Sequence, residues 1–152
     1  MKTRIATVSD ISQISELLDS LFSQEIEFIP NKEKQENGLK MIIDNPTLGH
    51  VLVMEKSNKI IATINLLYTI STALGAKVVI LEDMIVSSKF QKEGIGSKLL
   101  QNAIDFAKQQ QCQRITLLTD KSNTIAHEFY AKNGFKCSTM IPFRLSLNTI
   151  ET

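Results

Sequence analysis

The sequence predicts one α/β domain with a largely antiparallel sheet in its middle. Segments with strand and helix patterns alternate along the chain, and three β-rich runs follow one another between residues 50 and 86. The 152 residues, 43% of them hydrophobic and 22% charged, suffice for one compact core. No repeat, low-complexity tract or linker interrupts this pattern. We therefore expect a single domain over residues 1–152.

The first quarter of the chain predicts a strand followed by two helices. Residues 3–8 are typical of a strand, and Ser9 or Asp10 can cap a helix whose apolar residues recur at helical spacing as far as residue 24. A weaker helical pattern covers residues 32–43. It ends before Pro46, because proline disfavours helical backbone in the residue that precedes it.

The remaining elements follow from pattern changes along the chain. Residues 50–56 and 59–68 flank Ser57-Asn58, which is a hairpin turn signal, and residues 76–86 form a third β-rich run. A helix is expected from Gly94 to Gln110, because its apolar residues fall on one stripe. The later expectations are a strand over 114–119, a helix over 123–133 that stops at Gly134, and one or two closing strands over 135–147.

Composition excludes several classes of function. The 17 Lys and Arg residues against 16 Asp and Glu leave a net charge of +1 without a long block of like charge, so a nucleic-acid partner is not expected. The N-terminus lacks an apolar signal region, and no apolar run is long enough for a membrane span. The 2 cysteines lack metal-ligand or disulfide-framework spacing. We expect a cytoplasmic protein with reduced thiols and no membrane partner.

Gly94 and Gly96 lie where the third β-rich run gives way to a helix. A helix N-terminus has unpaired backbone N–H groups and the positive end of the dipole, so it can receive a phosphate, and glycine lets the oxygens approach closely. The alternative is a tight turn that binds nothing. A dinucleotide-binding fingerprint is absent, because its third glycine position is Leu99, and no Gly-Lys-Ser/Thr phosphate loop is present.

Two blocks of residues resemble the GNAT superfamily of acetyl-coenzyme A dependent N-acetyltransferases. The family pattern Arg/Gln-x-x-Gly-x-Gly/Ala is matched by Gln91, Gly94 and Gly96, and its later N…A..FY...GF segment is similar to residues 123–135. The likeness is best over residues 76–136. It implies a GNAT-like acyl-CoA N-acyltransferase fold, in which helices flank a central, mostly antiparallel mixed sheet.

The resemblance also implies acetyl-CoA as the cosubstrate and gives its contacts by position. Loop amides would hold the pyrophosphate, and the end of the preceding strand would offer backbone groups to the pantetheine arm. The residues so implied in the first block are Met84, Ile85, Val86, Gln91, Lys92, Glu93, Gly94, Ile95, Gly96 and Ser97. In the second block they are Asn123, Phe129 and Tyr130. Asn123 can equally be a helix cap.

The chemistry that the resemblance implies is attack of a primary amine on the acetyl thioester through a tetrahedral intermediate. Tyr130 matches the family's tyrosine acid, which would protonate the leaving thiolate; the alternative is a helix residue that packs with Phe129. No metal is expected, because His50 and His127 lack a third ligand.

Glu82 and Asp83 interrupt an otherwise apolar strand. Adjacent strand residues point to opposite faces, so at least one of the two acids is expected to face a cleft. We predict that Glu82 is the catalytic base, acting directly or through water, and that Asp83 binds the substrate. The alternative is an edge acid paired with Lys or Arg at the surface.

The predicted function is N-acetylation of a small-molecule amine. The alternatives are a sensor that binds acyl-CoA without turnover, an acetyltransferase of protein N-termini or lysines, and a phosphate-binding or structural domain of another fold. The acceptor is expected to be selected by the first two helices, the segment over residues 22–37 and the C-terminal strands. The family likeness leaves room for a homodimer.

Overall fold

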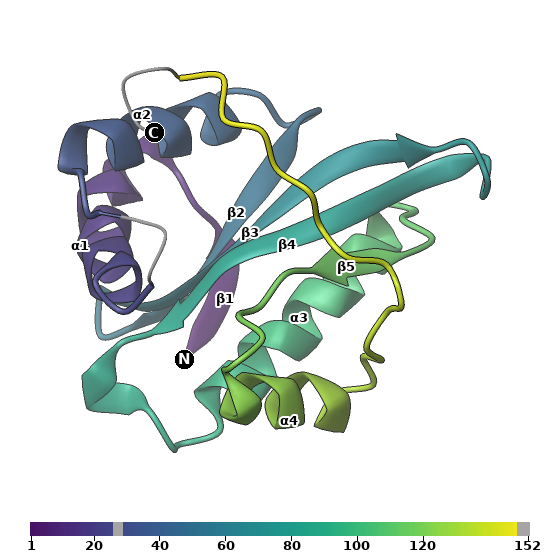
Figure 1. Ribbon diagram of the computed structural model, residues 1–152. Coiled ribbons are helices and arrows are strands. Elements are labelled where there is room, and N and C mark those ends of the chain that lie inside the picture. The colour runs from purple at the N-terminus through teal and green to yellow at the C-terminus, as the bar shows by residue number, and fades with distance from the viewer. Residues whose placement is uncertain (26–28, 149–152) are drawn as a thin grey trace. The chain divides into compact units, whose positions relative to one another are not determined.

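The computed structural model describes residues 1–25 and 29–148 (Figure 1). The chain divides into two compact units, residues 1–118 and residues 119–152, and each unit is considered by itself. A single domain over residues 1–152 stays a prediction.

The first unit is built on a mixed sheet of five strands that lie in the order of the sequence. The strands are β1 (Lys2–Ile5), β2 (Gly49–Lys56), β3 (Lys59–Ser71), β4 (Ala76–Val86) and β5 (Ile115–Leu117). The first four pair antiparallel, and β5 is parallel to β4. Ser57 and Asn58 join β2 to β3 with φ of 51° and 64°, the positive values that a type I′ hairpin turn requires. The predicted α/β class and antiparallel meander are confirmed.

Helices cover both faces of this sheet (Figure 1). Helices α1 (Ile11–Phe22) and α2 (Lys32–Ile43) bury Ile14, Leu18 and Leu39 against Val51 and Val53 of β2. Helix α3 (Ile95–Gln109) packs on β3 and β4 with the apolar stripe that the sequence predicts. Because strand residues alternate between faces, Leu52 and Met54 belong to the α3 side. The core therefore has two layers, one on each side of the sheet.

An ion pair connects β1 to the start of α1. Nη1 and Nη2 of Arg4 donate to the two carboxylate oxygens of Asp10 at 2.7 and 2.9 Å, and Nε of Arg4 donates to Glu55 at 3.1 Å. The backbone N–H of Thr7 also donates to Asp10, at 2.7 Å. The Arg4 guanidinium holds the pKa of the Asp10 carboxyl below its usual range. Asp10 is the N-cap residue of α1 by position, as expected, but its carboxylate accepts no N–H of α1 and turns back to Arg4 and Thr7.

The second unit contains helix α4 (Thr124–Lys132). The Asn123 side chain accepts the N–H of Ala126 at 3.1 Å, which confirms its capping role, and Gly134 follows the helix with φ of +95°. Residues 135–148 form no helix or strand, so the predicted closing strands are wrong for this structure. An alternating apolar pattern supplies no pairing partner, and Pro142 has no N–H to donate to a neighbouring strand.

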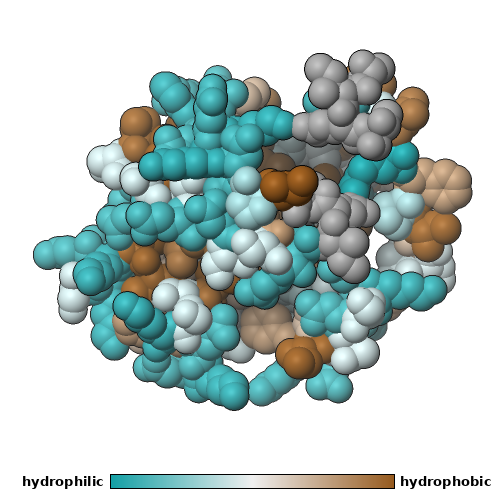
Figure 2. All heavy atoms as spheres, turned by 60° about the vertical axis from the view of Figure 1, so that its left-hand side comes forward, coloured by the Kyte–Doolittle hydropathy of each residue, from teal (hydrophilic) through white to brown (hydrophobic). Residues whose placement is uncertain are grey.

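Hydrophilic residues cover most of the face shown in Figure 2. Among residues 1–25 and 29–148, no helix has both the length and the apolar character that crossing a membrane requires.

Candidate active site

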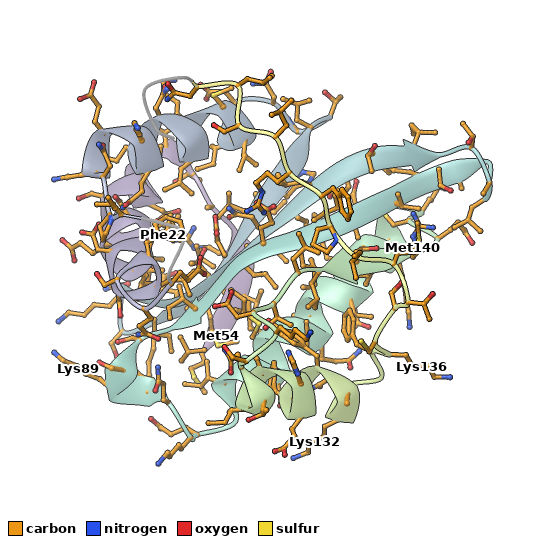
Figure 3. The ribbon with its side chains drawn as sticks, viewed as in Figure 1. Phe22, Met54, Lys89, Lys132, Lys136 and Met140 are labelled. Carbon is orange, nitrogen blue, oxygen red and sulfur yellow. The ribbon has the colours of Figure 1, made fainter. Side chains whose placement is uncertain are left out.

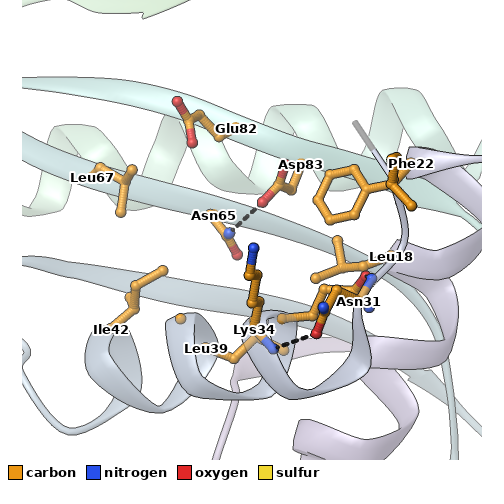
Figure 4. A pocket seen from close by; sticks show the side chains of 13 residues that line it. Leu18, Phe22, Asn31, Lys34, Leu39, Ile42, Asn65, Leu67, Glu82 and Asp83 are labelled. Carbon is orange, nitrogen blue, oxygen red and sulfur yellow. Dashed lines mark hydrogen bonds between the residues drawn. The ribbon is translucent and has the colours of Figure 1, made fainter. Parts of the chain in front are cut away.

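A pocket of about 300 Å³ is lined by residues of α1, α2, β3 and β4 (Figure 4). Its apolar lining includes Leu18 and Phe22 of α1 and Leu39 and Ile42 of α2. Figure 3 shows Phe22 on the side of α1 that faces the sheet. The pocket thus offers an apolar surface next to the middle of β3 and β4.

The polar groups of this pocket come chiefly from the two central strands. Asn65 of β3 and both Glu82 and Asp83 of β4 line it, and Lys34 extends over it from α2 (Figure 4). Sequence analysis did not identify Asn65. The available signal was a lone amide side chain in the apolar run over residues 60–67.

A β-bulge brings both acids of β4 to the same pocket. Thr63 pairs with Ile85 whereas Asn65 pairs with Glu82, so β4 carries one extra residue between these two pairs. Asp83 adopts φ of +54° at this point, a conformation that Asp tolerates better than most residues. The expectation that the acids face opposite sides is therefore wrong. Glu82 lies opposite Asn65, and Asp83 accepts a hydrogen bond from that same residue.

Asp83 has an acidity suited to proton transfer near neutral pH. Burial and the negative charges of Glu82 and Glu25 raise the pKa of its carboxyl to about 6. Its Oδ2 accepts a hydrogen bond from Nδ2 of Asn65 at 3.1 Å. Within residues 1–25 and 29–118, neither Glu82 nor Asp83 forms an ion pair with Lys or Arg. The predicted alternative of a surface acid paired with a cation is therefore not seen.

The loop before α3 has the geometry of an anion-binding turn. Gly94 caps α3 with φ of +76°, and Lys92 also has a positive φ, of 68°. The first N–H groups of a helix have no acceptor within the helix, so those of α3 can receive a phosphate. Gln91 connects the loop to the end of β4, because its Nε2 donates to the carbonyl of Val86 at 3.2 Å. Gly96 lies within the first turn of α3.

In the described first unit, the last residues of β4 have no neighbouring strand on the side where β5 pairs. β5 pairs with Val79, Ile80 and Leu81 only, whereas β3 pairs with β4 as far as Val86. Ile85 and Val86 therefore lie at an edge that no strand of the described first unit extends. An extended ligand can hydrogen-bond to such an edge as another strand would.

The other predicted cofactor residues lie around the same loop. Glu93 directly precedes Gly94, and Ser97 lies in the first turn of α3. Lys89 is exposed and points outward (Figure 3). Among the described residues, no group of three or more His, Cys, Asp or Glu side chains is placed to hold a metal ion.

Tyr130 lies in α4 of the second unit. Its ring packs edge-on against Phe129 and Phe135, with centroids 5.3 and 5.8 Å apart. Burial raises the pKa of the Tyr130 phenol, so the phenol keeps its proton at neutral pH. The structure thus groups Asn123, Phe129 and Tyr130 in or beside α4, and it groups the two acids with Asn65 in the first unit.

Comparisons with known proteins relate the chain to acetyltransferases. The Acetyltransferase (GNAT) family matches residues 11–135. An uncharacterized N-acetyltransferase, YhfO of Bacillus subtilis (strain 168), is 30% identical over 142 residues, which cover 91% of this chain and 92% of that protein. Streptothricin acetyltransferase A of the same strain is 38% identical over 56 residues, or 37% of this chain and 32% of that protein. The structure of a GNAT family acetyltransferase from Staphylococcus aureus subsp. aureus USA300_TCH1516 is similar with a TM-score of 0.75 and 25% identity, covering 96% and 98% of the two chains.

Proposed function

The chain belongs to the Acetyltransferase (GNAT) family, and from that premise we propose that it acetylates a primary amine of a small molecule bound beside Asp83. Membership makes the protein an N-acyltransferase with acetyl-CoA as its implied cosubstrate. One observation carries the proposal: the Asp83 carboxyl has a pKa of about 6 and lines a pocket of about 300 Å³. This volume is at the small end of the range for small-molecule sites.

We assign the base to Asp83, although the sequence favoured Glu82. Glu82 is exposed, whereas Asp83 is partly buried and is oriented by the Asn65 amide. A general base works best when its pKa lies near the operating pH, because it is then ionised and still accepts a proton readily. In this proposal Asp83 takes the proton that the acceptor's ammonium must lose before its nitrogen can attack. Glu82 contributes a charge that raises the pKa of Asp83.

Acetyl-CoA supplies the activated acetyl group, and three segments of this chain would hold it. Amides of residues 91–97 bind the pyrophosphate, and residues 84–86 offer backbone groups to the pantetheine arm. The family likeness assigns further contacts to Asn123 and Phe129. The left-handed Gly94 and the open edge at Ile85 and Val86 support the first two assignments.

Tyr130 is proposed as the acid that completes the proton balance. The nitrogen bonds to the acetyl carbon to form a tetrahedral intermediate, and its collapse breaks the carbon–sulfur bond. The sulfur gains a proton from the phenol, and the second proton of the nitrogen passes to the phenolate so formed, which restores Tyr130. The raised pKa of Tyr130 supports this role, because a phenol that stays protonated can donate.

The proposed function is tested by thiol release from acetyl-CoA with the purified protein. The acceptor panel contains polyamines, amino sugars and their phosphates, amino acids and N-terminal peptides. We expect release that depends on an amine. Binding of acetyl-CoA without release by any amine would favour the sensor, and absence of binding would contradict the assigned cofactor site.

Tyr130→Phe is expected to lower kcat about tenfold without changing the KM for acetyl-CoA. This loss of kcat is smaller than the loss expected when the leaving group depends strongly on a general acid, because a thiolate whose conjugate thiol has a pKa near 8.5 already leaves readily. Steady-state kinetics measure both parameters. Tyr68→Phe is the matched control: its hydroxyl lies 2.7 Å from Nδ1 of His50 in β2, and kcat should not change. Equal kcat in Tyr130→Phe and the wild type would remove Tyr130 from the acid role.

Gly94→Ala is expected to weaken acetyl-CoA binding severalfold. A non-glycine residue at φ of +76° has backbone strain of about 1–2 kcal/mol, and its relief turns the loop amides away from the phosphate. Calorimetry measures the Kd. Gly75→Ala in the β3–β4 turn is the matched control, because Gly75 also has a positive φ, of +61°, and neither site has atoms within 4 Å of the added methyl group. Both variants should lose similar thermal stability; equal loss of acetyl-CoA affinity would refute a specific role for the loop.

A further inference from the structure

We propose that Asn65 binds the nitrogen of the acceptor together with Asp83, and that the pocket therefore selects primary aliphatic amines. This inference rests on the proposed function and adds a specificity residue and a substrate class to it. Sequence patterns and the family likeness assign no role to Asn65.

The observation that carries the inference is an unsatisfied buried atom. Asn65 is only 4% exposed, and its Oδ1 has no hydrogen-bond partner among the described residues. A buried acceptor without a partner is costly, and native structures contain few of them. Asn65 lines the pocket, so a molecule that enters there can supply the missing donor.

The orientation of the Asn65 amide is fixed by its neighbour. Nδ2 donates to the Asp83 carboxylate at 3.1 Å, and the reversed amide would place two oxygens against each other. Oδ1 therefore keeps the direction shown in Figure 4, toward the pocket and the α2 side. Asn65 and Asp83 present two oxygen acceptors to one ligand group.

A primary ammonium group matches this pair of acceptors. It carries three N–H donors and a positive charge, so it can donate to Oδ1 of Asn65 and to the Asp83 carboxylate simultaneously. The carbon chain that follows the nitrogen would contact the apolar wall formed by Leu18, Phe22 and Leu39. Lys34 reaches toward Asn65 from α2 (Figure 4). The Lys34 side chain is exposed, and an acceptor that enters the pocket displaces it.

The first test compares acceptor kinetics of the wild type with Asn65→Leu and Thr63→Val. Leu has a similar branched shape but no acceptor, and Thr63→Val removes a buried hydroxyl from the same strand outside the pocket. Measurements use hexylamine and 1,4-diaminobutane at pH 9, where Asp83 is ionised in each protein. We expect the KM for amine to rise roughly ten- to hundredfold in Asn65→Leu, as for loss of a hydrogen bond to a charged group, with the KM for acetyl-CoA unchanged. Thr63→Val should match the wild type.

The second test needs no variant. Hexyltrimethylammonium has the chain and charge of hexylammonium but no N–H group. Its inhibition constant against hexylamine should be at least tenfold higher than the Kd of a primary amine of equal length. Equal inhibition, or an unchanged amine KM in Asn65→Leu, would overturn the role of Asn65.

The two proposals fail in different ways. Thiol release with other members of the broad amine panel, but with neither aliphatic amine, would overturn the substrate class and leave the acetyltransferase function standing. Absence of release with every amine would count against the proposed function itself.

Discussion

Asp83→Asn should lower kcat about a thousandfold, within the range of loss seen when a general base is removed. The amide has the shape of the carboxylate but not its charge, so the KM for the amine should also rise, because the ammonium group loses a charge-assisted hydrogen bond. The fall in kcat reports the loss of proton removal. Initial rates at pH 8 with the best acceptor of the panel measure kcat, and calorimetry confirms that acetyl-CoA still binds. A kcat within a factor of about three of the wild type would contradict the assignment of the base.

The pH dependence of kcat/KM tests the role of the Asp83 carboxyl independently of the substitution. The carboxylate form is the active base, so kcat/KM of the wild type should rise with pH through a limb centred near the pKa of about 6 that Asp83 has in the structure. Glu82 and Glu25 raise this pKa, Asn65 donates to the carboxylate, and Lys34 extends over the pocket from α2. The limb should be absent from Asp83→Asn.

Glu82→Gln is the matched variant for the neighbouring acid. It removes one negative charge next to Asp83, so the acidic limb should move to lower pH, and the variant should keep far more activity than Asp83→Asn. If Glu82→Gln loses the activity and Asp83→Asn keeps it, the base is Glu82, as the sequence first suggested.

The elements that the sequence predicted well are those whose signal is local. The apolar stripe of α3 and the positive-φ turn at Ser57 and Asn58 each follow from a few neighbouring residues, and the structure has both. The prediction of closing strands over residues 135–147 was wrong, because a strand is defined by its pairing partner and an alternating pattern does not identify one.

Glu82 and Asp83 of β4 show the same limit of prediction from local sequence within the site. Their presence in an apolar strand indicated a functional cleft, but their directions depend on an extra residue in the pairing with β3. Asn65 was missed for a related reason. An unsatisfied oxygen exists only once the fold has buried one end of the amide and Asp83 has bound the other. Residue types could therefore be predicted, whereas register and hydrogen-bond satisfaction could not.

Asp10→Ala should lower the free energy of unfolding by about 3 kcal/mol, a large part of the stability of a small domain. The substitution leaves Arg4 with Glu55 alone and leaves the N–H of Thr7 without its carboxylate acceptor. Urea denaturation at pH 7 measures the change. Asp44→Ala is the matched control, because Asp44 pairs with Lys40 on the exposed surface of α2, where such a pair contributes about 0.5 kcal/mol.

The stability lost in Asp10→Ala should also depend on pH. Arg4 lowers the pKa of Asp10 in the folded protein, so the folded state favours the ionised carboxylate more than the unfolded chain does. Its stabilising contribution is complete above the unfolded pKa of about 4 and disappears as the pH falls through the lower folded value. The difference between wild type and variant should therefore be constant from pH 7 to 5 and shrink below pH 4. A difference that stays the same down to pH 2 would show that packing, and not the charge of Asp10, joins β1 to α1.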